Sequence, residues 1–171
     1  SSQISKVITD YNLLETDKLH EFIEKNPLNC GSASLARIAE LVNSQRENNA
    51  AYYTNKFIIN EIYKELPEFE KNEISILEPS VGIGNFLPFI FRKYEGTVKV
   101  NLDVVDIDLN NIKILKTILK RQQVPDNFTI NFINDDFLLH QFNKRYDLVI
   151  GNPPFSKLKA GEAKVYLKNN F

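Results

Sequence analysis

The chain has 171 residues, of which 43% are apolar and 25% charged, values typical of one globular domain with its own core. Its 21 Lys and Arg and 22 Asp and Glu give a formal charge of −1, which excludes a globally basic nucleic-acid binder but not a local basic patch. The single cysteine, Cys30, excludes an intrachain disulfide and a cysteine-based zinc cage, so we expect no metal site. Without a long apolar run or a signal-like amino terminus, we expect a soluble, cytoplasmic protein with no membrane partner.

The first 50 residues are predicted to be helical. Thr16 is a candidate N-cap of a short helix that Asn26-Pro27 ends. A second helix is predicted to begin near Ser32 or Ser34, because apolar residues then repeat at helical spacing, namely Leu35, Ile38, Ala39 and Val42. Residues 48–51 have the composition of a junction. We therefore expect a helical segment over 1–50 and a second unit over 51–171.

From residue 52 onward, short β-rich runs alternate with helical ones. A predicted helix over 56–66, ended by Pro67, precedes four predicted strands, at 74–77, 98–105, 128–133 and 146–150. Helices at about 85–93 and 109–122 connect the first three strands, and Pro88 is tolerated in the first helical turn. This alternation requires crossover connections, so it predicts an α/β fold, a parallel sheet with helices on both faces. Because such sheets bind ligands at the carboxyl ends of their strands, the residues that follow each strand are the functional candidates.

A glycine-containing turn follows the first predicted strand, at residues 78–86. Gly82 and Gly84 permit a tight turn and a close ligand approach, and the next helix presents free N–H groups. Leu87 stands where a dinucleotide-binding fingerprint has its third glycine. Glu78 would repel a pyrophosphate and instead suits a ligand with an amine or a positive centre. The alternative is a tight β–α turn with no ligand.

Acidic residues follow the second and third predicted strands. Asp106 comes about 20 residues after the glycine turn, where a carboxylate can accept hydrogen bonds from both hydroxyls of a ribose. The alternative role, a helix N-cap, suits Asp108 better. Asp136 and Phe137 place a carboxylate beside an aromatic ring, which can hydrogen-bond to a purine and stack on it. Their alternative is a cap followed by a core phenylalanine.

The segment Asn152-Pro153-Pro154-Phe155 follows the fourth predicted strand. Two successive prolines fix φ and cannot donate backbone hydrogen bonds, so they end the strand rigidly. Asn152 adds an amide, and Phe155 adds a stacking face. The segment therefore predicts a pocket edge for a planar group with an exocyclic amine, and its alternative is a polar turn that closes the strand.

With these motifs, residues 51–156 resemble the class I S-adenosylmethionine-dependent methyltransferases, which have a Rossmann-like fold, and among them the DNA amino-methylating group with an Asn-Pro-Pro-Phe/Tyr tetrapeptide. The order of the motifs resembles the gamma group of adenine-N6 enzymes. The resemblance implies S-adenosylmethionine as the cofactor and double-stranded DNA as the substrate. It also implies a restriction-modification context in a bacterial cytoplasm, with a restriction or specificity subunit or domain as a candidate partner.

The resemblance also implies roles for individual residues. The tetrapeptide Asn152, Pro153, Pro154 and Phe155 would be catalytic. The cofactor would be bound by Tyr53, Thr54, Glu78, Pro79, Ser80, Gly82, Gly84, Asn85, Phe86, Asp106, Ile107, Asp136 and Phe137. Nucleic acid would be contacted by Phe155, Lys157 and Lys159, the last two from a basic segment whose alternative is a solvated helix face. Asn55 departs from the family pattern, which has proline after Tyr-Tyr-Thr.

The expected chemistry is activation of an exocyclic amine. If the Asn152 oxygen and the Pro153 carbonyl accept both amine protons, the nitrogen lone pair becomes available to attack the sulfonium methyl in line. The base must leave the duplex, and Phe155 would stack on it. Methylation at cytosine C5 needs a cysteine nucleophile, and Cys30 lies far away in the sequence. Cytosine-N4 enzymes more often carry serine at the position of Asn152, which favours adenine N6.

Two other interpretations stay open. Amino-methyltransferases of ribosomal RNA or of release factors have the same fold and tetrapeptide, and a non-catalytic subunit would bind cofactor or DNA without transferring methyl. The family's sheet has seven strands, whereas four are predicted here, and no target-recognition domain follows them. We therefore expect residues 1–171 alone to be the truncated N-terminal part of the catalytic domain, with weak or absent activity.

Overall fold

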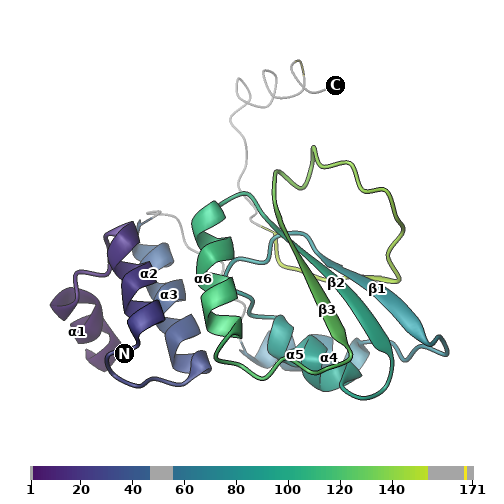
Figure 1. Cartoon of the computed structure of the whole chain (residues 1–171), viewed down its shortest axis with the longest axis horizontal. Coiled ribbons are helices and arrows are strands. Elements are labelled where there is room, and N and C mark those ends of the chain that lie inside the picture. The colour runs from purple at the N-terminus through teal and green to yellow at the C-terminus, as the bar shows by residue number, and fades with distance from the viewer. Residues whose placement is uncertain (1, 47–55, 154–167, 169–171) are drawn as a thin grey trace.

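The computed structural model describes residues 2–46, 56–153 and 168, and within them an α/β fold (Figure 1). Its helices are α1 (Ser2–Asp10), α2 (Thr16–Lys25), α3 (Ser32–Arg46), α4 (Lys56–Glu65), α5 (Leu87–Tyr94) and α6 (Leu109–Leu119). Its strands are β1 (Glu73–Glu78), β2 (Lys99–Asp106), β3 (Phe128–Asn134) and β4 (Leu148–Val149). The predicted fold class is confirmed.

The strands form one parallel sheet in the order β3-β2-β1-β4. β1 lies between β2 and β4. The chain adds β2 and β3 on one side of β1 and then returns to add β4 on its other side. Parallel sheets bind ligands where the strand order reverses in this way. The carboxyl ends of β1, β2 and β4 therefore form the candidate site.

The three helices that pack on the sheet share one of its faces. Alternate residues of β1 and β2 form one buried cluster with α4, α5 and α6, and it includes Ile76, Leu102, Ile59, Ile90 and Leu115. Because the chain steps from β1 to β2 to β3 in one direction, right-handed crossovers place α5 and α6 on the same side. In the described part of the chain, helices α4, α5 and α6 therefore cover one face of the sheet, whereas helices on both faces were expected. There, the opposite face carries Asp103 of β2, which accepts a hydrogen bond from the Tyr146 hydroxyl at 2.6 Å.

The N-terminal helices pack against α6, and in Figure 1 α2 and α3 lie on the side of α6 away from the strands. They form a second buried cluster, made of Ile8, Leu13, Leu19, Phe22, Ile23, Leu35, Ile38, Ala39 and Val42 together with Ile83, Ile114 and Ile118. Arg46 of α3 connects this helix to the turn between α1 and α2, because its guanidinium donates to the carbonyls of Leu13 and Leu14. The helical segment thus reaches the glycine turn itself, through Ile83.

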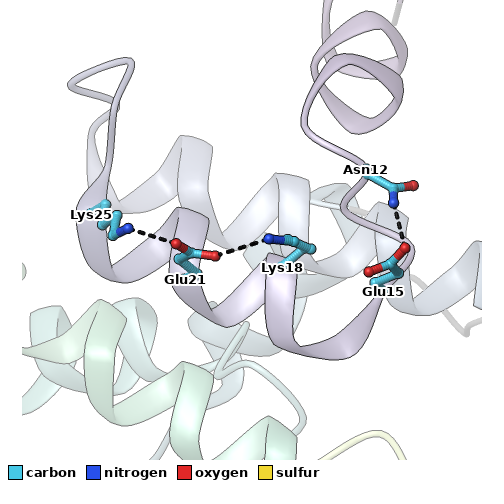
Figure 2. Close-up of polar contacts among 5 residues, drawn as sticks. All are labelled: Asn12, Glu15, Lys18, Glu21 and Lys25. Carbon is cyan, nitrogen blue, oxygen red and sulfur yellow. Dashed lines mark hydrogen bonds and ion pairs between the residues drawn. The ribbon is translucent and has the colours of Figure 1, made fainter.

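The exposed face of α2 carries only surface pairs. Glu21 accepts from Lys25 at 2.6 Å and from Lys18 at 3.5 Å, while Asn12 donates to Glu15 in the turn before the helix (Figure 2). Exposed pairs of this kind contribute little to stability, because solvent screens the two charges. The buried cluster, rather than these pairs, therefore holds the N-terminal helices on α6.

Several predicted element ends needed correction. Glu15, not Thr16, is the N-cap of α2, and its side chain makes no capping bond, whereas Asn26 caps the other end in the left-handed conformation at φ 47°. Helix α6 ends at Leu119, three residues early, because tight turns follow it. Helix α5 begins two residues late, and β4 has only two residues. The predicted junction near residue 50 lies outside the described residues, so the domain boundary stays a prediction.

Candidate functional site

Three segments meet at the carboxyl edge of the sheet. The turn after β1 crosses to the end of β2, where the Val81 N–H donates to the Val105 carbonyl at 2.9 Å. The chain after β4 stays beside β1, because the Ile150 N–H donates to the Leu77 carbonyl at 2.9 Å. The segments 78–86, 106–108 and 150–153 are therefore neighbours, although up to 75 positions separate them along the chain.

The two glycines of the turn serve different purposes. Both have positive φ, 54° at Gly82 and 84° at Gly84. A Cβ on Gly84 would lie 2.7 Å from Leu115 Cδ1 and 3.0 Å from Leu87 Cδ1, so this glycine lets the turn pack against α5 and α6. A Cβ on Gly82 would meet nothing within 4 Å. Only Gly82 thus leaves open space at which a ligand can approach the backbone.

This difference predicts unequal costs of substitution. We expect Gly84→Ala to lower the free energy of unfolding by about 2–5 kcal/mol, because left-handed strain adds to overpacking. Gly82→Ala carries only the backbone strain and should cost about 1–2 kcal/mol. Urea unfolding of the two variants beside the unsubstituted protein measures both values. Equal losses would contradict the assignment of Gly84 to packing.

Asp106 holds the turn in place with its carboxylate. Its Oδ2 accepts from the Gly82 N–H at 2.7 Å, and its Oδ1 accepts from the Asp108 N–H at 2.8 Å and from Asn111 Nδ2 at 3.3 Å. Burial raises the pKa of Asp106, and these three donors oppose that rise. Three of the roughly four acceptor positions of a carboxylate are thus taken, and about one remains for a ligand.

Glu78 is the most deeply buried acid of the described residues, with 1% of its surface exposed. Burial raises its pKa well above the usual 4.5, and the nearby charge of Asp106 raises it further. Its Oε2 and the Ser80 Oγ are buried atoms without a hydrogen-bond partner in the structure. Two buried, unsatisfied polar atoms in one turn are costly unless a ligand engages them.

The raised pKa of Glu78 predicts a pH-dependent gain from Glu78→Gln. The folded state keeps this proton at pH values where the unfolded chain, with a pKa near 4.5, has lost it, so the wild-type protein loses stability as the pH rises above 4.5. The neutral amide removes that loss. The variant should therefore melt higher at pH 8, by ~2–4 °C for each 1 kcal/mol gained, with the gain vanishing below pH 4.5. Thermal unfolding against pH checks this, and a lower melting point at pH 8 would contradict it.

The segment after β4 enters the site beside Pro79. A Cβ on Gly151 would lie 3.0 Å from Pro79 Cδ, so β4 leaves the sheet in contact with the turn after β1. Asn152 follows half-buried and Pro153 exposed. Six residues with predicted roles lie outside the described residues, namely Tyr53, Thr54, Pro154, Phe155, Lys157 and Lys159.

The other predicted cofactor residues differ in their surroundings. Asn85 is half-buried, whereas Phe86 is 4% exposed and belongs to the core cluster of the sheet. Ile107 is 72% exposed beside Asp106. Asp136 accepts from the Leu138 N–H at 2.9 Å, so its carboxylate caps its own turn. The Phe137 ring lies 5.8 Å from that of Phe142, in an aromatic group of the segment before β4.

Sequence reasoning missed two asparagines at this edge. Asn111, in the first turn of α6, donates to Asp106, and Asn134, at the end of β3, donates to the carbonyls of Asp106 at 2.9 Å and Ile107 at 3.0 Å. Both fix the end of β2, and Asn111 lies five positions after Asp106. A polar residue in the first turn of the following helix is the signal that could have indicated it. Asp108 is the N-cap of α6, as predicted, and accepts from the Asn110 N–H at 2.8 Å.

The hydrogen-bond acceptors at this edge suit a positively charged ligand rich in hydrogen-bond donors. Glu78, Asp106 and Asp108 supply acceptors, and the open space at Gly82 gives access to them. The described residues contain no group of three or more His, Cys, Asp or Glu side chains that could hold a metal ion. None of the described helices is long and apolar enough to cross a membrane.

Comparison with known proteins gives three kinds of match. Residues 56–168 match the family model described as Methyltransferase small domain. The chain is 27% identical over 115 residues to the type II methyltransferase M.CvrRI of Paramecium bursaria Chlorella virus XZ-6E, covering 67% of this chain and 27% of that protein. It is 27% identical over 150 residues to the type II methyltransferase M.VspI of Vibrio sp. (strain 343), covering 86% of this chain and 35% of that protein.

A solved structure from Listeria monocytogenes, described as a class I S-adenosylmethionine-dependent methyltransferase, shares the fold. It superposes with a TM-score of 0.56 at 20% identity, covering 80% of this chain and 44% of that one. The chain thus spans about a third of the two curated relatives and under half of the solved neighbour.

Proposed function

The chain belongs to the Methyltransferase small domain family, whose cofactor is S-adenosylmethionine, and we propose that it carries the cofactor site and the catalytic tetrapeptide of a DNA adenine-N6 methyltransferase. The observation that carries the proposal is the contact between Gly151 and Pro79, because Gly151 directly precedes Asn152 and Pro79 belongs to the turn after β1. We call this turn, residues 78–86, together with the Asp106 carboxylate that holds it, the acidic turn. A cofactor held by that turn and a base held by Asn152 would be neighbours. The further assignment to restriction-modification, and to a restriction or specificity subunit as partner, is part of this proposal.

The acidic turn fits the chemical groups of S-adenosylmethionine. The remaining acceptor position of Asp106 suits a ribose hydroxyl, and accepting from both hydroxyls requires one present donor to yield. The unpartnered Oε2 of Glu78 suits a donor such as the amine of the cofactor. When bound, the cofactor supplies an electrophilic methyl group.

At the substrate end, this chain's own residues would hold an amine and accept hydrogen bonds from its N–H groups. The Asn152 side-chain oxygen and the Pro153 carbonyl are the proposed acceptors, and Phe155 is the proposed stacking surface. The short pairing of β4 with β1, Ile76 with Leu148 and Leu77 with Val149, fixes where this segment leaves the sheet. Catalysis then depends on positioning and electrostatic stabilisation, without a covalent intermediate.

DNA is the favoured substrate for two reasons. Both curated relatives described above are type II methyltransferases. In addition, a Tyr-Tyr-Thr segment precedes the glycine turn, and the turn itself has the form Glu-Pro-Ser-x-Gly. Ribosomal RNA and release factors are the alternative substrates, and a subunit that binds cofactor or DNA without transfer is the alternative of another class.

The test is transfer of labelled methyl by the whole protein in separate reactions with unmethylated DNA, ribosomal RNA and a release factor. Calorimetry with S-adenosylmethionine accompanies the assay. The proposal predicts label in DNA alone. Label in RNA or protein would overturn the DNA assignment, and cofactor binding without transfer to any substrate would favour the non-catalytic subunit.

A further inference from the structure

A line of hydrogen bonds connects the N-terminal helices to the acidic turn. Asn43 of α3 donates through Nδ2 to Asn111 Oδ1 on α6 at 2.9 Å, across 68 positions of the chain. Asn111 Nδ2 donates in turn to Asp106 Oδ1 at 3.3 Å, and Asp106 Oδ2 accepts from the Gly82 N–H. All three side chains of this line are partly or fully buried.

The Asp106 carboxylate, at the end of this line, determines which side chain donates in each hydrogen bond. An ionised carboxylate only accepts, so Asn111 must turn its NH₂ towards Asp106. Its oxygen then faces Asn43, which must present its own NH₂. Each amide thus has one orientation that satisfies both neighbours, and a change at Asn43 can reverse Asn111.

A second contact joins the same two parts of the molecule. Ile83, between the two glycines of the turn, is 5% exposed and packs in the cluster formed by α1, α2, α3 and α6. The N-terminal helices therefore hold the turn from two sides, by apolar packing at Ile83 and by the amide line at Asp106. Arg46 of α3 lies close enough to Asp108 for their charges to interact.

We propose that Asn43 is a positioning residue for the cofactor, acting through Asn111 to orient the Asp106 carboxylate, so that the N-terminal helices form part of the cofactor site. This inference rests on the proposed role of Asp106 in cofactor binding. Asn43 itself lies on α3 and needs no contact with the ligand. The docking of the N-terminal helices on α6 thus contributes to the affinity for S-adenosylmethionine.

The test compares two substitutions of Asn43 with a matched control. Asn43→Asp presents acceptors only, which should reverse the Asn111 amide, turn its oxygen towards Asp106 and weaken S-adenosylmethionine binding about tenfold, or ~1.4 kcal/mol. Asn43→Ala removes the donor without reversing Asn111 and should weaken binding less than threefold. Asn110→Asp places the same charge on the exposed surface of α6 and should leave binding unchanged. Calorimetry gives the affinities, and thermal unfolding separates loss of fold from loss of affinity.

A double substitution decides whether the effect passes through Asn111. With Asn111→Ala in place, Asn43→Asp should cause no further loss of affinity. An equal loss in both backgrounds would overturn the inference, because the new charge would then act directly on Asp106. Equal affinities for Asn43→Asp and wild type would also overturn it. Asp106→Ala distinguishes failure of this inference from failure of the proposed function. If Asp106→Ala leaves cofactor binding unchanged, the proposed role of Asp106 in cofactor binding is wrong.

Discussion

Asn152→Ala in the whole protein is expected to reduce methyl transfer to DNA by on the order of 10²–10³-fold or more, while the affinity for S-adenosylmethionine changes little. The proposed reason is that the Asn152 oxygen accepts a hydrogen bond from the exocyclic amine as the nitrogen gives up its conjugation with the ring. The acidic turn that would hold the cofactor belongs to other strands, so its groups stay in place. Single-turnover transfer of labelled methyl and calorimetry measure the two quantities.

Two control variants sharpen this prediction. Asn152→Asp keeps an acceptor but adds a charge, and Asn152→Ser introduces the residue typical of cytosine-N4 enzymes, so both should keep some transfer above the alanine level. Turnover by Asn152→Ala within threefold of wild type would contradict the proposed catalytic role. A matching loss of cofactor affinity would instead show that Asn152 supports the cofactor.

Asp106→Ala is expected to weaken S-adenosylmethionine binding by about 10- to 10²-fold, because a hydrogen bond to a charged group contributes ~1.5–3 kcal/mol and the Gly82 N–H also loses its acceptor. Asp103→Ala is the matched control, since it removes a buried carboxylate from the opposite face of the same strand. The control should lower stability but leave the affinity of the folded protein unchanged. Equal affinities for Asp106→Ala and wild type would remove Asp106 from the cofactor site.

The same residue predicts how cofactor binding depends on pH. Burial raises the pKa of Asp106, so the carboxylate takes up a proton at higher pH than an exposed aspartate does. The protonated form is a poorer acceptor for a ribose hydroxyl, and the affinity should therefore fall as the pH is lowered through this raised pKa. In Asp106→Asn the decline should be smaller, because only the protonation of Glu78, whose pKa burial also raises, then contributes to it. Calorimetry on both proteins from pH 8 down towards 3.8, the ordinary pKa of an aspartate, tests the difference.

Local patterns in the sequence were enough to predict the sheet and its edge. Alternating apolar residues, helical spacing and turn residues act over a few positions, so β1, β2, β3, α4, α5 and α6 were predicted within about three residues at each end, and the start of α3 was predicted too. The cap at Asp108 has the same local origin. Since parallel strands end at one edge, the meeting of the segments after β1, β2 and β4 followed from the predicted topology.

Features that depend on distant contacts could not be predicted. Gly84 has the local pattern of a ligand-approach glycine, but its neighbour is Leu115, 31 positions later, so its packing role was hidden. Phe86, which is predicted to bind the cofactor, also lies in the core cluster of the sheet, and this burial has no local signature. Neither the burial of Glu78 nor the Asn43–Asn111 bond has a local signature, because each depends on how separate helices pack on the turn.

The central claim, transfer of methyl to adenine N6 in DNA, is tested most directly by identifying the methylated nucleoside. The whole protein is incubated with labelled S-adenosylmethionine and unmethylated DNA, and the DNA is then digested and its nucleosides separated. The proposed function predicts label in N6-methyladenine. Label in N4-methylcytosine, or none in DNA although the cofactor is bound, would contradict it.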